Sequence, residues 1–120
     1  MYNNSKIEFI YVFKFYDLIS DDDVLKFAKD IEILFNKNEI FYIILDVMHI
    51  KNFNFEFFDK FDYIFEDEYK VKKYFKGSVI LTNNKRILSF ILSIKKPLMP
   101  TNVNNNYEDA IKYIKDLKNI

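Results

Sequence analysis

The order of hydrophobic and polar residues predicts strands and helices in alternation along the chain. Ile7–Tyr16 alternates with a period of two, with the odd-numbered positions on the more apolar face, which is typical of a strand. Glu39–Ile50 opens with an almost continuous apolar run that Asp46 closes, and this pattern favours a central strand covered on both faces. Ser78–Thr82 predicts a short buried strand. Pro97 and Pro100 leave room for one very short strand in Leu98–Val103.

Segments with the helical period separate these strands. Ser20 is a good helix cap, and three aspartates follow it at the positive end of the helix dipole. The helix that they begin has one apolar stripe, made of Val24, Phe27, Ala28, Ile31, Leu34 and Phe35. The segment from Phe55 to about Phe75 predicts a long second helix, with a break near Asp67–Tyr69 and with Gly77 as its left-handed C-terminal residue.

Two further helices complete the pattern. Asn83 or Asn84 caps the third helix, which is predicted from Lys85 to Lys95. The last helix is predicted to begin at Tyr107, directly after another asparagine. The sequence therefore predicts an α/β fold of four successive β-α units in one domain, residues 1–120. Because parallel strands are joined by right-handed crossovers, we expect a mainly parallel four-stranded sheet in chain order, flanked by helices.

Charge and residue types narrow the functional classes. Lys plus Arg and Asp plus Glu are both 18, and Arg86 is the single arginine, which disfavours a nucleic-acid binder. The chain has no cysteine and one histidine, His49, so we expect no metal site and no cofactor. No apolar stretch approaches the roughly 18 residues that span a bilayer. The N-terminal residues lack the pattern of a signal peptide, and we expect a cytoplasmic protein.

Asp46 and His49 are the residues in this sequence best placed for chemistry. Asp46 lies at the C-terminal end of the central strand, where open α/β sheets bind their ligands. His49 follows three residues later, and the pair suggests an acid and base. The alternative interpretation is that Asp46 caps a nearby backbone N–H and that His49 is a surface residue. Since no nucleophile motif accompanies them, we predict that the protein is not an enzyme.

Three segments resemble a known family in pitch and spacing. Ile43–Asp46, Ser78–Thr82 and Tyr107–Ile111 are similar to the second strand, the third strand and the last helix of the STAS domain, the SpoIIAA-like fold of bacterial anti-sigma-factor antagonists. The resemblance covers nearly the whole chain. It implies a SpoIIAA-like fold and a regulatory module that binds a protein partner.

The sequence departs from that family where the antagonists carry a phosphorylatable serine. Asn54–Phe57 stands at the position of their Asp-Ser-Ser-Gly-like motif and contains no Ser, Thr or Gly, so the phosphoswitch is not carried over. Glu56 would supply a permanent negative charge in the first helical turn. The resemblance places the partner-facing surface at Asp46, His49, Phe53, Asn54, Phe55 and Glu56.

This surface supports a constitutive docking hypothesis with Phe53 or Phe55 as an apolar anchor. In the alternative, Glu56 only stabilises the helix and both phenylalanines belong to the core. The sequence does not name the partner and is compatible with a homo-oligomer. A second functional hypothesis is a carrier or sensor of a small apolar ligand or lipid, suggested by the Phe-rich second helix and the wide apolar face of the third.

Overall fold

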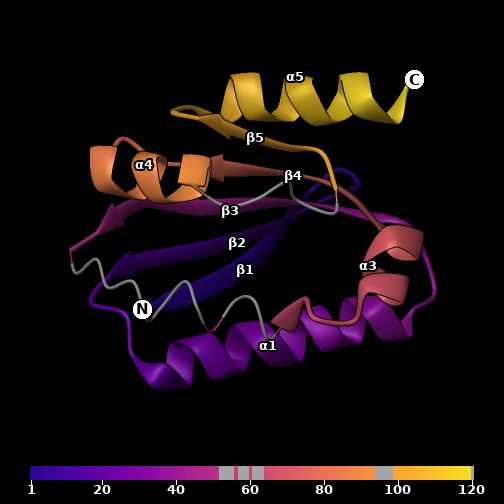
Figure 1. The fold of residues 1–120 in the computed structure, drawn as a ribbon, viewed down its shortest axis with the longest axis horizontal. Helices are drawn as coiled ribbons and strands as arrows, with labels where there is room; N and C mark the ends of the chain where they lie inside the picture. Colours follow the sequence, from indigo (N-terminus) through magenta and orange to yellow (C-terminus); the bar gives the residue numbers. More distant parts are fainter. Residues whose placement is uncertain (52–55, 57–59, 61–63, 94–98, 120) are drawn as a thin grey trace.

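A twisted β-sheet forms the middle layer of the protein (Figure 1). The computed structural model describes residues 1–51, 56, 60, 64–93 and 99–119. Within them the strand order is β1-β2-β3-β4-β5, with the strands β1 (Tyr2–Ile7), β2 (Ile10–Asp17), β3 (Phe41–Ile50), β4 (Phe75–Leu81) and β5 (Thr101–Asn104). The helices are α1 (Asp21–Asn36), α3 (Glu68–Tyr74), α4 (Lys85–Ser93) and α5 (Tyr107–Lys118).

The four parallel strands expected from the sequence are present in chain order, as β2, β3, β4 and β5. The expectation of a four-stranded sheet was wrong, because β1 adds an antiparallel strand beside β2. The predicted strand Ile7–Tyr16 is divided by a tight turn at Glu8, where φ is 55°. The alternation predicted that Ile7 and Phe13 share a face. Ile7 instead ends β1 and packs with Ile10 on the other side of the sheet.

Helices cover both faces of the sheet (Figure 1). Because β2 to β5 follow one another in one direction, right-handed crossovers put every connecting helix on the same face. That face holds Phe15 and Leu45 with Phe27 of α1, Val71 of α3 and Ile87 of α4. The other face is covered by α5, whose buried residues pack with Ile10, Val12, Ile44, Val79 and Leu81. The prediction that the central strand is buried on both faces is confirmed for β3.

The connection from β3 to β4 differs from the expected long helix. The described residues 56, 60 and 64 are helical, and α3 then begins anew with Asp67 as its cap, so the predicted break is present. Gly77 lies inside β4 and has no left-handed conformation, which contradicts its predicted role as a helix C-terminus. A Cβ there would lie 2.7 Å from Leu117 Cδ1 and 3.3 Å from Tyr42 Cδ1, so the glycine lets α5 approach the sheet closely.

The parallel strands give the molecule two distinct ends. We call the end where β2, β3, β4 and β5 finish the carboxyl edge, and the end where they begin the amino edge. The helices α1, α4 and α5 start at the carboxyl edge, each after a capping side chain. Asn84 accepts the Arg86 N–H at 2.8 Å, and Asn106 accepts the Asp109 N–H at 2.8 Å. No helix in the described part of the chain is long and apolar enough to cross a membrane.

Candidate functional site

The side chain of Asp46 is buried beneath the carboxyl edge, with 2% of its surface exposed. Its Oδ1 accepts the N–H of Met48 at 3.0 Å, and its Oδ2 accepts the hydroxyl of Tyr107 at 2.5 Å. Burial first, and then the hydrogen bond and charge of Asp46, raise the pKa of the Tyr107 hydroxyl well above its usual range. β3 continues past Asp46 to Ile50, so Asp46 lies within the strand and not at its end, where the sequence predicted it. Because Tyr107 opens α5, this pair ties β3 to the start of the last helix.

His49 is exposed near the end of β3. The pairing of β2 with β3 shifts between Lys14 and Tyr16, so Tyr16 lies opposite His49 while Lys14 lies opposite Asp46. Among the residues that the structure describes, no hydrogen bond or ion pair joins His49 to Asp46. Asp46 instead caps a backbone N–H, as the alternative interpretation of the sequence held. The structure thus does not bring the suggested acid and base together.

The chain leaves β3 beside the end of β2. The backbone N–H of Lys51 donates to the carbonyl of Asp17 at 2.8 Å, and its ammonium lies 3.0 Å from the Asp17 carboxylate. Asp17 has a left-handed backbone, with φ of 58°. These two contacts hold Lys51 beside the end of β2. The segment with the remaining candidate residues follows Lys51 in the sequence.

The predicted surface residues Phe53, Asn54 and Phe55 lie outside the described residues. Glu56 is helical and exposed. Lys60, also helical, forms an ion pair with Asp21 at the start of α1.

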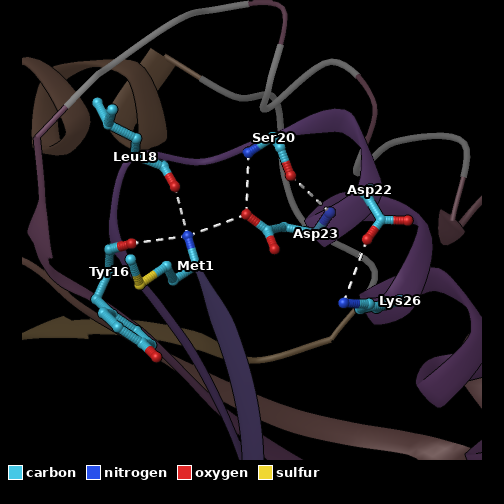
Figure 2. A network of polar contacts seen from close by, with 7 residues as sticks. All are labelled: Met1, Tyr16, Leu18, Ser20, Asp22, Asp23 and Lys26. Carbon is cyan, nitrogen blue, oxygen red and sulfur yellow. Dashed lines mark hydrogen bonds and ion pairs between the residues drawn. The ribbon is translucent and has the colours of Figure 1, made fainter.

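A network of polar contacts surrounds the start of α1 (Figure 2). Ser20 and Asp23 form a capping box, with the Asp23 N–H donating to Ser20 Oγ at 3.2 Å and the Ser20 N–H donating to Asp23 Oδ2 at 2.9 Å. The ammonium of Met1 lies 3.0 Å from the same Oδ2 and donates to the carbonyls of Tyr16, at 2.9 Å, and Leu18. The sequence predicts the cap. It does not predict the ion pair with the Met1 ammonium, because Met1 is brought to this place by strand β1, which the sequence does not indicate.

Burial of Asp23 opposes its ionisation, but the hydrogen bonds from Ser20 and the positive charge of Met1 outweigh this effect and lower the pKa of its carboxyl. Asp23→Asn is expected to reduce the free energy of unfolding at pH 7 by about 1 kcal/mol, because the amide has no charge to offer the ammonium and the helix dipole. The carboxylate's contribution is present above its unfolded pKa of about 3.9 and is lost as the pH falls through the lowered folded value.

Urea unfolding at several pH values checks this prediction. The difference between the wild type and Asp23→Asn should be constant near neutral pH and should disappear in acid. Asp22→Asn is the matched control: Asp22 is exposed, and among the described residues its one ion pair is with Lys26 one turn along the helix, so its effect should stay within about 0.5 kcal/mol. Equal effects of the two variants would contradict the role assigned to Asp23.

Comparisons with known proteins show similarity in structure alone. No protein-family model matches the sequence, and no curated protein matches it. The anti-sigma factor antagonist SpoIIAA in its unphosphorylated form is 10% identical with a TM-score of 0.71, over 96% of this chain and 98% of that chain. An uncharacterised Shewanella loihica protein with a SpoIIAA-like fold is 12% identical with a TM-score of 0.64, over 94% and 91% of the two chains.

An anti-sigma factor antagonist from Mycobacterium paratuberculosis is similar to the same extent. It is 12% identical with a TM-score of 0.66, over 97% of this chain and 94% of that chain. The predicted resemblance is therefore confirmed at the level of the fold: the chain has a STAS, or SpoIIAA-like, fold.

Proposed function

We propose that the protein is a non-enzymatic regulatory module that binds a protein partner at its carboxyl edge. The docking surface consists of His49, Phe53, Asn54, Phe55 and Glu56, with Asp46 buried beneath it as a structural support. The observation that carries the proposal is the pairing of a SpoIIAA-like fold with an exposed His49 and an exposed Glu56 on the segment that follows β3. The similar structures of anti-sigma factor antagonists support a regulatory role for such a fold.

In this proposal the docking surface is able to bind its partner at all times and is not switched on by a modification. The resemblance matches the stretch Asn54–Phe57 to the antagonists' phosphorylatable motif, and Glu56 in this stretch supplies a negative charge that needs no phosphorylation. A phosphoserine would carry roughly −1.5 to −2 charges and would be reversible. The partner is therefore expected to bind without prior action of a kinase.

The alternative function is the carriage of an apolar ligand, and the described aromatic side chains of the larger core do not support it, because they pack against one another. The described phenylalanines of the larger core contact one another, with ring centroids of Phe35 and Phe41 at 5.1 Å and of Phe41 and Phe75 at 5.2 Å. Aromatic rings that pack against one another in this way belong to the hydrophobic core. Native mass spectrometry of gently purified protein separates the two functions, because a carrier would retain a lipid or other apolar molecule.

A differential capture experiment tests the docking surface. Wild type and the variants Glu56→Lys and Phe55→Ala serve as baits in extract of the source cell, and Glu32→Lys is the control. Glu32 is an exposed residue of α1, so the control makes the same charge change away from the proposed surface. Baits are first checked by circular dichroism.

The proposal predicts a protein enriched by wild type and Glu32→Lys but not by Glu56→Lys. Its affinity for Glu56→Lys should be at least about tenfold weaker, equivalent to about 1.4 kcal/mol. A folded Phe55→Ala should also bind more weakly, because buried aromatic anchors carry much of the energy of an interface. If all folded baits capture the same proteins equally well, the interface lies elsewhere on the molecule.

A further inference from the structure

The amino edge gathers positive charge. The helices α1, α3 and α5 end there, beside the β1–β2 turn and the starts of the parallel strands (Figure 1). The lysines at these helix ends, in the turn and at the strand starts are Lys6, Lys37, Lys72, Lys73, Lys76, Lys115 and Lys118. Lysine near a helix C-terminus complements the helix dipole, and Lys76 donates to the Lys72 carbonyl at the end of α3 at 2.6 Å. Such stabilisation explains why lysines occur here, but it does not neutralise their charge.

Lysines at the two ends of the molecule have different partners. Around the carboxyl edge, Lys26, Lys51 and Lys60 each lie against an aspartate. At the amino edge, the described residues include one ion pair, between Lys115 and Glu8. The other carboxylates in these segments are Glu39, Glu68 and Asp116.

Most amino-edge lysines lie over aromatic rings. The ammonium of Lys6 is 4.9 Å from the ring centroid of Tyr11, and that of Lys118 is 3.9 Å from the ring centroid of Phe9. Lys73 lies 5.5 Å from the ring centroid of Tyr69. The face of an aromatic ring attracts a cation, but the ring has no formal charge and therefore does not neutralise the cation. Although the chain has no formal net charge, the lysines of the amino edge outnumber its carboxylates, so this edge carries an excess of positive charge.

Exposed apolar side chains lie among these lysines. Ile40, directly before β3, is 60% exposed, and Tyr69 beside Lys73 is 71% exposed. Lysines interleaved with aromatic and aliphatic side chains suit an anionic lipid surface, where the charges meet headgroups and the apolar groups enter the interface. Protein interfaces instead favour arginine and are depleted in lysine. The single arginine, Arg86, is at the carboxyl edge, at the start of α4.

We infer that the amino edge docks on an anionic phospholipid bilayer. The protein lies peripherally on the membrane, and its carboxyl edge, at the other end of the parallel strands, faces away from the lipid. The inference stands apart from the proposed protein partner, because the two surfaces share no residue.

Co-sedimentation of the full chain with vesicles tests this inference. The probes are phosphatidylcholine vesicles with and without phosphatidylglycerol. We expect sedimentation with the anionic vesicles at low salt, little with pure phosphatidylcholine, and release as salt screens the charges. Removing one lysine near an anionic surface weakens binding by about fivefold, so Lys37→Gln with Lys73→Gln should weaken it by about 25-fold.

The double variant Lys26→Gln with Lys60→Gln is the matched control. It removes the same charge from lysines at the other end, and it should bind anionic vesicles like wild type once circular dichroism has shown that both double variants fold. Three outcomes would overturn the inference: no sedimentation with anionic vesicles, an equal loss in the control, or salt-sensitive binding to soluble polyglutamate with none to vesicles. The last outcome would assign the amino edge to an acidic polypeptide.

Discussion

Phe27→Ala should lower the free energy of unfolding by about 3–5 kcal/mol, the usual effect of deleting a buried phenylalanine. Phe27 is 2% exposed and lies in the middle of the larger core. Its ring centroid is 5.1 Å from that of Phe13 and 5.4 Å from that of Phe15, both on β2. The variant therefore removes a central part of the contact between α1 and the sheet. For a domain of this size, which is stable by about 5–15 kcal/mol, the loss is a large fraction of the total.

Leu25→Ala is the control for this prediction. Leu25 is on the same helix but is 59% exposed, so its truncation should change the free energy of unfolding by no more than about 0.5 kcal/mol. Urea unfolding followed by circular dichroism measures both variants. If Phe27→Ala were as mild as Leu25→Ala, α1 would not pack on the sheet as described.

Tyr107→Phe is expected to have the next largest effect, about 1–3 kcal/mol, because it leaves a buried carboxylate oxygen of Asp46 without its donor. Tyr113→Phe is the control: Tyr113 is also a half-buried tyrosine of α5, and no hydrogen bond of its hydroxyl is found among the described residues. The control should stay within about 0.5 kcal/mol of wild type. Double-mutant analysis with Asp46→Asn measures the energy shared by the pair.

The effect of Tyr107→Phe should also depend on pH. Burial and the neighbouring Asp46 raise the pKa of Tyr107 in the folded protein above the value of about 10 expected in the unfolded chain. The neutral hydroxyl therefore stabilises the fold fully below that pH, and its contribution is lost as the pH rises through the folded value. The difference between wild type and Tyr107→Phe should be constant near neutral pH and should shrink above about pH 10. A difference that grows in alkali would contradict this account.

Elements with a strong local signal were predicted well. β3 is buried on both faces, and its apolar run could be read directly. Ser20, Asn84 and Asn106 all cap helices, because a short polar side chain before a helical stripe satisfies free N–H groups whatever surrounds it. The stripe of α1 is likewise buried at Val24, Phe27, Ile31, Leu34 and Phe35.

Features that depend on distant residues were missed. β1 has the sequence YNNSKI, and polar residues at an edge strand leave no alternating pattern to detect. The sequence around Gly77 predicts a helix end, because the approach of Leu117 from α5 cannot be inferred from the neighbours of Gly77 in sequence. The burial of Asp46 depends on Tyr107, which is 61 positions further along the chain. For the same reason the resemblance assigns Asp46 to the partner-facing surface, although its side chain is buried.

The most direct test of the docking surface is backbone amide hydrogen exchange of the protein, alone and with the partner captured by the wild-type bait. We predict slower exchange on binding in His49–Glu56, at the carboxyl edge, and no change in Lys72–Gly77, at the amino edge. Protection confined to the amino edge, or unchanged exchange throughout His49–Glu56, would contradict the central claim that a protein partner docks at the carboxyl edge.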